Sequence, residues 1–220
     1  MNANDRALKV AEFLLQIEAI KLNPENPFTW ASGLRSPIYC DNRKTLSYPE
    51  VRTFIRDAFA ATIRESFSNA EVIAGVATGG IAIGALVAEV LNLPFIYVRS
   101  EAKKHGLGNQ VEGVLKPRQR VVVIEDLIST GSSSLKAVDA LREAEAEIIG
   151  MVAIFTYGFS AAANRFDETN CTLKTLSNYD ALLEQAVNSG SITHSQQEAL
   201  SSWKSNPEAW SERFLARQTH

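Results

Sequence analysis

Short, nearly continuous apolar runs alternate with helix-like segments through the middle of the chain. The apolar runs cover residues 72–76, 95–99, 120–126 and 148–157. Between them, residues 81–93 and 132–146 place apolar side chains at helical spacing. Strands that are apolar along their whole length are buried on both faces, which is typical of a parallel sheet covered by helices. The pattern therefore predicts an α/β fold with a central, mostly parallel sheet flanked by helices.

The first fifty residues have a different pattern. Residues 5–22 are predicted to form one amphipathic helix. Residues 22–43 contain three prolines and one glycine, which predicts a loop with short strands around Phe28 to Trp30 and Ile38 to Cys40. A helix begins again at Pro49, because proline suits the first position of a helix.

The C-terminal region is helical again. Thr193 and Gln196 have the spacing of a capping box, and Asn206 followed by Pro207 predicts the start of another helix. Because no linker divides the chain, we expect one domain over residues 1–220. The expected parts of this domain are a core over about residues 49–176 and a small hood from about residues 22–43 with parts of the C-terminal region.

Composition and charge exclude some classes of function. Hydrophobic residues make up 45% of the chain and charged residues 21%, which is normal for a globular protein. The net charge of −3 weighs against a nucleic-acid partner held by bulk positive charge. The N-terminus has neither a signal-peptide layout nor a span of about 20 apolar residues, so no membrane association is expected. Cys40 and Cys171 have no metal or redox spacing, and we expect a reducing, cytoplasmic location.

Two loops at the predicted sheet edge are candidates for binding an anion. Residues 77–80 and 127–133 each follow a strand and lead into a helix, whose N-terminal N–H groups suit a phosphate. Either loop alone could equally be an ordinary turn with capping serines. Neither has the G-x-x-x-x-G-K-[ST] or G-x-G-x-x-G pattern, so an ATPase or a dehydrogenase is not favoured.

Glu125 and Asp126 end the strand that precedes the second loop. Two carboxylates at the end of a buried strand are costly unless they have partners. A vicinal sugar diol or a hydrated Mg²⁺ would be such a partner. A structural ion pair with Arg118 or Arg120 is the alternative. With the hydroxyl-rich loop, the acids favour a site for a ribose 5-phosphate.

Three segments together resemble one enzyme family. "VVVIEDLISTGSSS" (121–134) resembles the binding motif of type I phosphoribosyltransferases, which use phosphoribosyl pyrophosphate. "RSEAKKHGLGNQVEG" (99–113) is similar to the mobile catalytic loop of orotate phosphoribosyltransferases, although a solvated hairpin tip would have a similar composition. "FTWASGLRSPIYCDNR" (28–43) is similar to that family's N-terminal segment, which helps to enclose orotate. The resemblance runs from about residue 5 to residue 160.

The resemblance implies an activity and a set of site residues. Family members transfer ribose 5-phosphate from phosphoribosyl pyrophosphate to orotate, with Mg²⁺ required, and yield orotidine 5′-monophosphate and pyrophosphate. The residues implied to bind phosphoribosyl pyrophosphate are Arg99, Lys103, His105, Glu125, Asp126, Leu127, Ile128, Ser129, Thr130, Gly131, Ser132 and Ser133. Those implied to act in catalysis are Lys103, His105 and Asp126, with Mg²⁺ held mainly by substrate and water near Asp126. Thr78 and Gly79 fall in the pyrophosphate loop, where a strained or cis peptide is expected. In a homodimer, the loop over residues 99–113 would reach the neighbouring site.

The sequence departs from the family at several cations. Some members have a lysine at the position of Ala31, another near Gly79 and an arginine near Gly158, and some have a lysine in place of Ser100. These cations contact orotate, pyrophosphate or their surroundings. The residues implied to bind orotate here are Ser129, Arg35 and Ser36.

Two other functions remain open from the sequence. A phosphoribosyltransferase for another base would have the same phosphate site and would differ in residues 28–43 and 155–160. A nucleotide-sensing regulator on the same fold could also retain the motif over residues 121–134. Such a regulator would not need Lys103 and His105, and a basic surface or an attached DNA-binding element would be expected.

Overall fold

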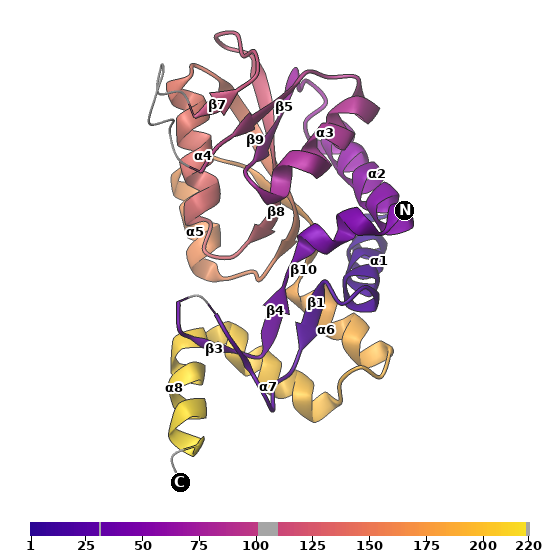
Figure 1. Cartoon of the computed structure of the whole chain (residues 1–220), viewed down its shortest axis with the longest axis vertical. Helices are drawn as coiled ribbons and strands as arrows, with labels where there is room; N and C mark the ends of the chain where they lie inside the picture. Colours follow the sequence, from indigo (N-terminus) through magenta and orange to yellow (C-terminus); the bar gives the residue numbers. More distant parts are fainter. Residues whose placement is uncertain (31, 101–109, 219–220) are drawn as a thin grey trace.

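The computed structural model describes residues 1–30, 32–100 and 110–218 of the 220-residue chain (Figure 1). Within these ranges the main sheet has six strands in the order β10-β9-β8-β5-β6-β7. Its strands are β5 (Val72–Val76), β6 (Phe95–Val98), β7 (Val111–Glu112), β8 (Arg120–Ile128), β9 (Glu147–Thr156) and β10 (Leu173–Asn178). All neighbouring pairs are parallel except β6 and β7, which confirms the predicted fold class.

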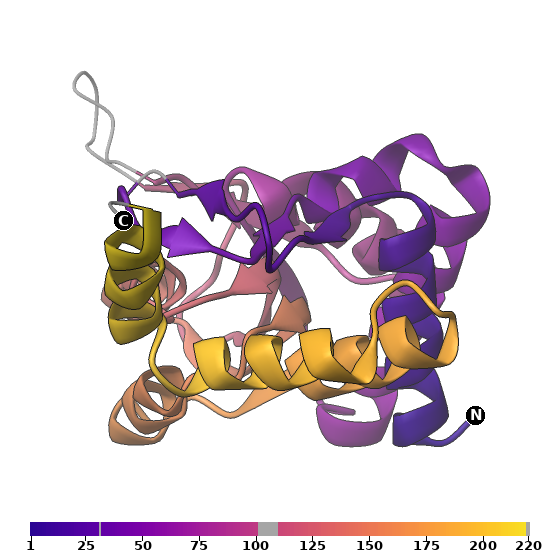
Figure 2. The ribbon, with the colours of Figure 1, turned by 90° about the horizontal axis from the view of Figure 1, so that it is seen from below.

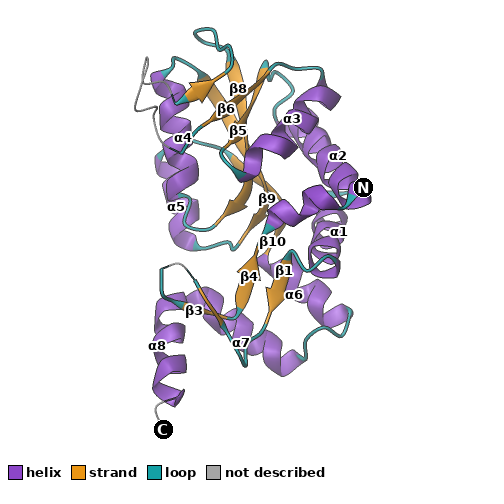
Figure 3. Cartoon of the chain, in the orientation of Figure 1, coloured by secondary structure: helices purple, strands orange, loops and turns teal. Residues whose placement is uncertain are grey.

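Helices cover both faces of this sheet (Figure 3). One face carries α1 (Ala3–Gln16), α2 (Pro49–Ser66) and α3 (Gly79–Leu91), and the other carries α4 (Ser132–Glu143) and α5 (Ser160–Glu168). Alternate residues of β8 belong to the two resulting cores: Val122 and Ile124 to the first, and Val121 and Val123 to the second. Burial of each such side chain contributes about 1.5–3 kcal/mol, which explains why the strand is apolar throughout.

A smaller part of the molecule lies beyond the carboxyl ends of the central strands. Its strands are β1 (Ile20–Leu22), β2 (Phe28–Thr29), β3 (Arg35–Ser36) and β4 (Ile38–Cys40), which pair as β1 with β4 and β2 with β3. The 3₁₀ helix η1 (Asn42–Ser47) follows them, and α6 (Tyr179–Asn188), α7 (His194–Ser205) and α8 (Pro207–Gln218) complete the C-terminal region. Seen from below, the C-terminal helices lie across from the hood strands (Figure 2). The α8 helix contacts β3, where the backbone N–H of Arg35 donates to the buried hydroxyl of Ser211 at 2.9 Å.

Several predicted boundaries need correction. The helix predicted over residues 5–22 is wrong at its end, because α1 stops at Gln16 and Glu18 takes a left-handed conformation (φ 52°). Ile20 and Leu22 then pair with β4, although their apolar character continued the helical pattern. The β8 strand extends to Ile128, two residues beyond its predicted end, because it keeps pairing with β9. We predicted neither α5 nor β10.

The predicted helix signals at the C-terminal end are confirmed. The Thr193 hydroxyl accepts from the backbone N–H of Gln196, whose side chain accepts from the backbone N–H of Thr193. Asn206 likewise accepts from the N–H of Ala209 at the start of α8. Among the described residues, none of the helices combines the length and the apolar character that crossing a bilayer requires.

Candidate active site

The two predicted anion loops meet at one cavity of about 310 Å³ at the carboxyl edge of the sheet. Its walls come from the end of β5, the start of α3, the end of β8 and the turn into α4. The lining residues are Val76, Ala77, Thr78, Gly79, Glu125, Asp126, Leu127, Ser129, Thr130, Gly131 and Ser133. The structure therefore brings together most of the residues that the sequence indicated for a sugar phosphate. We call this space the acid cavity.

The two adjacent acids of the acid cavity have different surroundings. Glu125 is 6% exposed, and its carboxylate accepts from the N–H of Asp126 at 3.0 Å and from the Ser134 hydroxyl at 2.9 Å. Burial, followed by the charge of Asp126, raises the pKa of Glu125 to about 8. Asp126 is half-buried, and its carbonyl oxygen accepts from the Asn42 amide at 2.6 Å. Glu125 is thus anchored in the scaffold.

The predicted alternative, an ion pair between these acids and an arginine, is wrong. Arg120 begins β8 at the opposite end of the strand, where its guanidinium lies 3.4 Å from Glu71. Arg118 precedes that same end of the strand. The acids therefore lie at the ligand-binding edge of the sheet, and the arginines lie at the other edge.

Residues of α5 contact the turn between β8 and α4 and hold it in place. Gly131 has a φ of 78°, and a side chain there would also approach the ring of Phe166. The Arg165 guanidinium donates to the Thr130 carbonyl at 2.8 Å and to the Ser132 hydroxyl at 3.0 Å. These contacts fix the turn, whose remaining N–H groups and hydroxyls are those expected to bind a phosphate.

Three described residues that were implied to bind phosphoribosyl pyrophosphate do not line the acid cavity: Arg99, Ile128 and Ser132. Ile128 is fully buried in the core, and its carbonyl accepts from the N–H of Tyr157. Ser132 is at the first position of α4 with its hydroxyl bonded to Arg165. Leu127, Ser129, Thr130, Gly131 and Ser133 all line the cavity.

The loop after β5 approaches the acids closely. The peptide bond between Ala77 and Thr78 is cis, which confirms the expectation for this loop. A Cβ atom at Gly79 would overlap the carboxyl group of Asp126, and one at Gly80 would overlap the carbonyl oxygen of Ile124. A side chain at position 79 would therefore fit only if the carboxyl group of Asp126 moved.

The base of the predicted catalytic loop is described, but its tip is not. The N–H of Arg99 donates to the carbonyl of Gln110 at 2.9 Å, and the Arg99 guanidinium lies 3.6 Å from the carboxylate of Glu112. These contacts join the two ends of the segment. Lys103 and His105 lie outside the described residues.

A second cavity of about 330 Å³ adjoins the acid cavity and shares Ser129 and Thr130 with it. We call it the hood cavity. Trp30 and Leu34 of the hood, residues 159–161 after β9, and residues 204–208 between α7 and α8 form its other walls. The Trp30 indole N–H donates to the Ile38 carbonyl at 3.1 Å, and its ring lies 5.6 Å from that of Tyr157. The Trp30 ring thus forms a flat, aromatic wall of the hood cavity, and these contacts hold it in place.

The side chains predicted to bind orotate from the hood are engaged elsewhere. The Arg35 guanidinium donates to the Thr29 hydroxyl at 2.8 Å. Ser36 is 1% exposed, and its hydroxyl donates to the Ile38 carbonyl at 2.9 Å. Neither residue lines the hood cavity, whereas Ser129 does.

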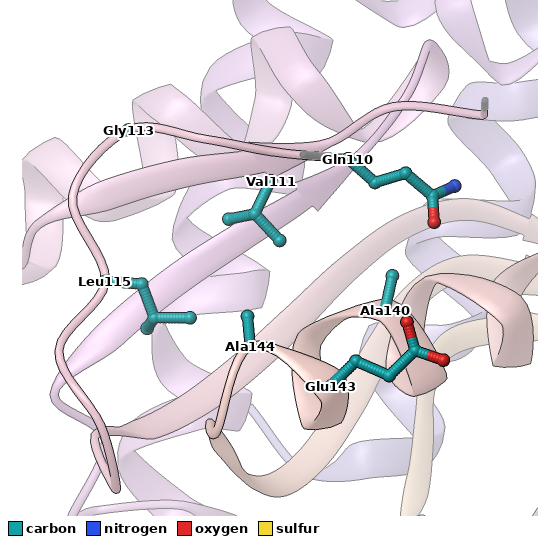
Figure 4. Close-up of a pocket in the computed structure, with 7 residues that line it drawn as sticks. All are labelled: Gln110, Val111, Gly113, Leu115, Ala140, Glu143 and Ala144. Atoms are coloured by element: carbon teal, nitrogen blue, oxygen red, sulfur yellow. The ribbon is translucent and has the colours of Figure 1, made fainter. Parts of the chain in front are cut away.

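A third cavity of about 360 Å³ lies between β7 and the end of α4 (Figure 4). Val111 and Leu115 lie on one side of it, and Ala140 and Ala144 lie on the other. The charged residue among those lining it is Glu143. Because it lies at the C-terminal end of α4 and its charged residue is an acid, this cavity does not suit a phosphate.

Three residues at the site were missed in the sequence. Asn42 donates to Asp126, Arg165 holds the turn after β8, and Lys204 lines the hood cavity. All three lie far along the chain from the residues they serve. Arg165 and Lys204 lie in helices whose sequences carry no motif for binding or catalysis, so only the fold could indicate them.

Comparisons with known proteins agree with this geometry. The family model described as "Phosphoribosyl transferase domain" matches residues 47–182. An orotate phosphoribosyltransferase of Porphyromonas gingivalis is 55% identical over 91% of this chain and 96% of its own length, and one of Phocaeicola vulgatus is 57% identical over 91% and 94%. The solved orotate phosphoribosyltransferase of Aeropyrum pernix matches with a TM-score of 0.73 at 28% identity, over 84% of this chain and 99% of that one. The Leishmania donovani UMP synthase structure matches with a TM-score of 0.76 at 25% identity, over 90% of this chain and 42% of that one.

Proposed function

The chain belongs to the orotate phosphoribosyltransferases of the phosphoribosyl transferase family, and from this premise we propose which of its residues perform each part of the reaction. The reaction is a pentosyl transfer in pyrimidine biosynthesis. Ribose 5-phosphate passes from phosphoribosyl pyrophosphate to orotate, and pyrophosphate leaves. The acid cavity binds phosphoribosyl pyrophosphate, the donor of the ribosyl group, and the hood cavity binds orotate, the acceptor.

Asp126 accepts hydrogen bonds from the ribose hydroxyls, with Glu125 behind it. In support, Asp126 is the more exposed of the two, and Glu125 bonds to Ser134 of the scaffold. The 5-phosphate is bound by the turn over residues 127–133 at the N-terminus of α4. Replacement Asp126→Asn should weaken the binding of phosphoribosyl pyrophosphate in calorimetry, whereas Asp139→Asn on the exposed face of α4 should not. Unchanged affinity in Asp126→Asn would refute the ribose assignment.

The acid cavity needs positive charge from outside its walls. Among the described residues that line it are two carboxylates and neither a lysine nor an arginine, although the substrate carries a phosphate and a diphosphate. In the described ranges, no cluster of three or more His, Cys, Asp or Glu side chains could enclose a metal ion alone. A Mg²⁺ ion held by substrate oxygens, water and Asp126 fits this donor set. When bound, Mg²⁺ supplies positive charge to the diphosphate as it leaves.

The catalytic loop supplies the remaining cations. Cleavage at the anomeric carbon leaves cationic character on the ribose and adds negative charge to pyrophosphate. Lys103, Arg99 and His105 stabilise that leaving group, while Thr78 and Gly79 contact it through the backbone. The loop also excludes water, which would otherwise compete with orotate for the ribosyl group.

We infer that the enzyme works as a homodimer in which residues 99–113 reach the neighbouring site. The support is the family membership, together with the finding that the described part of the chain places no basic residue in the lining of the acid cavity. Mixing a Lys103→Ala chain with an Asp126→Asn chain should restore part of the activity. If the mixture stays as inactive as either variant, each chain supplies its own loop.

The acceptor side combines Ser129 with the hood residues Arg35 and Ser36. Ser129 lines both cavities, so it lies where ribose and base would meet. Arg35 and Ser36 shape the hood from β3, since their side chains have other partners. The hood over residues 22–43 and the C-terminal helices belong to one domain with the core, and a reducing cytoplasm suits the free Cys40 and Cys171.

The observation that supports this proposal best is that the acid cavity and the hood cavity adjoin and share Ser129 and Thr130. The test is an absorbance assay with phosphoribosyl pyrophosphate and Mg²⁺, in which orotate, adenine, hypoxanthine and uracil are compared. Turnover of orotate alone is expected. Turnover of a purine would overturn the assignment of the hood cavity, and binding of the donor without turnover of any base would favour a regulator.

A further inference from the structure

The hood cavity contains one ammonium group that the reaction so far leaves without a role. Of the residues that line this cavity, the charged ones are Lys204 and Glu208. Lys204 lies in the last turn of α7, and Glu208 lies in the first turn of α8. Lys204 is therefore the cation that the described residues place in the cavity assigned to the base.

The Lys204 ammonium is held by Asp180 but keeps a free donor. Its Nζ lies 2.8 Å from both carboxylate oxygens of Asp180, at the start of α6. An ammonium group has three donors, so one remains for a ligand. The side chain of Lys204 is 25% exposed, whereas that of Asp180 is 76% exposed. The pairing positions the ammonium at the rim of the cavity without burying it.

Gly158 shows which part of the sheet the ammonium faces. Gly158 follows β9 with a φ of 71°, and a Cβ atom built on it would lie 3.5 Å from both Cε and Nζ of Lys204. The end of Lys204 thus covers the backbone just beyond the carboxyl end of β9. A longer side chain at position 158 would compete for the same space. At the carboxyl end of β9, the cation is thus supplied by Lys204 of α7 and not by residue 158.

The walls of the cavity suit a planar, anionic base. Trp30 and Phe159 present aromatic surface, and Ser129 joins the cavity to the ribose side. Orotate is a flat pyrimidine whose distinguishing group is a carboxylate. We propose that Lys204 binds the carboxylate of orotate and thereby selects orotate over pyrimidines that lack this group. This inference rests on the proposed placement of the base in the hood cavity.

Glu208 and Asp180 have separate roles in this arrangement. Glu208 repels a carboxylate, so it favours the orientation in which the orotate carboxylate points to Lys204. Asp180 is a positioning residue, because it restrains the ammonium and touches no substrate. Its exposed carboxylate is screened by water and only partly offsets the charge of Lys204.

Binding of two product nucleotides tests the proposal apart from catalysis. Orotidine 5′-monophosphate and uridine 5′-monophosphate differ only by the carboxylate. Calorimetry on the wild-type protein should show tighter binding of the first. In Lys204→Met that preference should fall about 10- to 100-fold, as expected for loss of a hydrogen bond to a charged group. The KM for orotate should rise similarly, while the KM for phosphoribosyl pyrophosphate stays the same.

The control variants separate binding from a structural effect. Asp180→Asn breaks the same ion pair but keeps the ammonium, so the nucleotide preference should persist, and Lys204→Arg should restore most of it. Lys136→Met, on the exposed face of α4, should leave the preference unchanged. An unchanged preference in Lys204→Met, or an equal loss in Lys204→Met and Asp180→Asn, would overturn the proposal. Failure of the wild-type protein to use orotate would instead overturn the proposed function itself.

Discussion

A Cβ atom built on Gly79 would overlap the carboxyl group of Asp126, so these two residues lie in close contact. The two residues come from different strand–helix units, at the start of α3 and near the end of β8. Their contact joins the pyrophosphate loop to the ribose site. A substitution at Gly79 or at Asp126 should therefore affect the binding of both the pyrophosphate and the ribose of phosphoribosyl pyrophosphate.

Replacement Gly79→Ala should displace the Asp126 carboxylate or the start of α3. Overpacking of this kind costs about 1–3 kcal/mol of the free energy of unfolding. We expect a lower melting temperature and a higher KM for phosphoribosyl pyrophosphate. Gly190→Ala is the control for the KM, because its added methyl group has no atom within 4 Å, although its φ of 69° strains the backbone there. A normal KM in Gly79→Ala would contradict the close contact.

The raised pKa of Glu125 should make stability depend on pH. Its pKa is about 8 in the folded protein against an ordinary value of 4.5, so the folded state binds the extra proton. The stabilisation is complete below pH 4.5 and is lost as the pH rises through 8. The slope is at most about 1.4 kcal/mol per pH unit. Urea unfolding at pH 5, 6.5 and 8 measures it.

Replacement Glu125→Gln should remove that component and flatten the pH profile. The glutamine keeps a carbonyl oxygen for the Ser134 hydroxyl and carries no titratable proton. Glu147→Gln, at the exposed start of β9, serves as the control and should keep the wild-type slope. The same slope in Glu125→Gln would show that another group is responsible.

Arg165 should matter for the donor although it does not line the acid cavity. Replacement Arg165→Met removes two hydrogen bonds that hold the turn after β8. We expect the KM for phosphoribosyl pyrophosphate to rise about 10-fold, corresponding to about 1.4 kcal/mol. Arg142→Met removes a similar bond, to the Thr169 carbonyl at 2.8 Å, away from the cavity. Equal kinetics in both variants would argue against a special role of Arg165.

Lys103 should act on turnover more than on folding. Replacement Lys103→Ala should lower kcat about 10²–10³-fold, which is typical when a donor to developing negative charge is removed. Steady-state kinetics measures this effect, and an unchanged melting temperature shows that the protein folds. Lys116→Ala, at an exposed position after β7, should have normal activity. A near-normal kcat in Lys103→Ala would refute the catalytic role of the loop.

The donor side could be predicted from the sequence because it is built from local segments. The end of β8 and the turn over residues 127–133 are contiguous, so one motif contains most of their chemistry. The acceptor side could not be predicted this way. Trp30, Phe159 and Lys204 come from three distant segments, and only tertiary packing brings them together.

The error at β1 has a similar cause. Ile20 and Leu22 have the spacing that would continue an apolar helical face, and their pairing with β4 is a long-range contact. Local periodicity contains no information about such a partner. Glu18, with its left-handed backbone, marks the end of the helix only in the folded chain.

The bond between the Arg35 N–H and the Ser211 hydroxyl has a consequence for how the enzyme matures on the ribosome. The chain is synthesised from its N-terminus, so the acid cavity leaves the ribosome well before α7 and α8. A nascent chain that has exposed residues 1–178 but not α7 and α8 contains all the described residues that line the acid cavity, whereas Lys204 and Glu208 of the hood cavity are still missing. Translation therefore completes the lining of the acid cavity before that of the hood cavity, in which Trp30 and Leu34 come early in the chain and residues 204–208 come last.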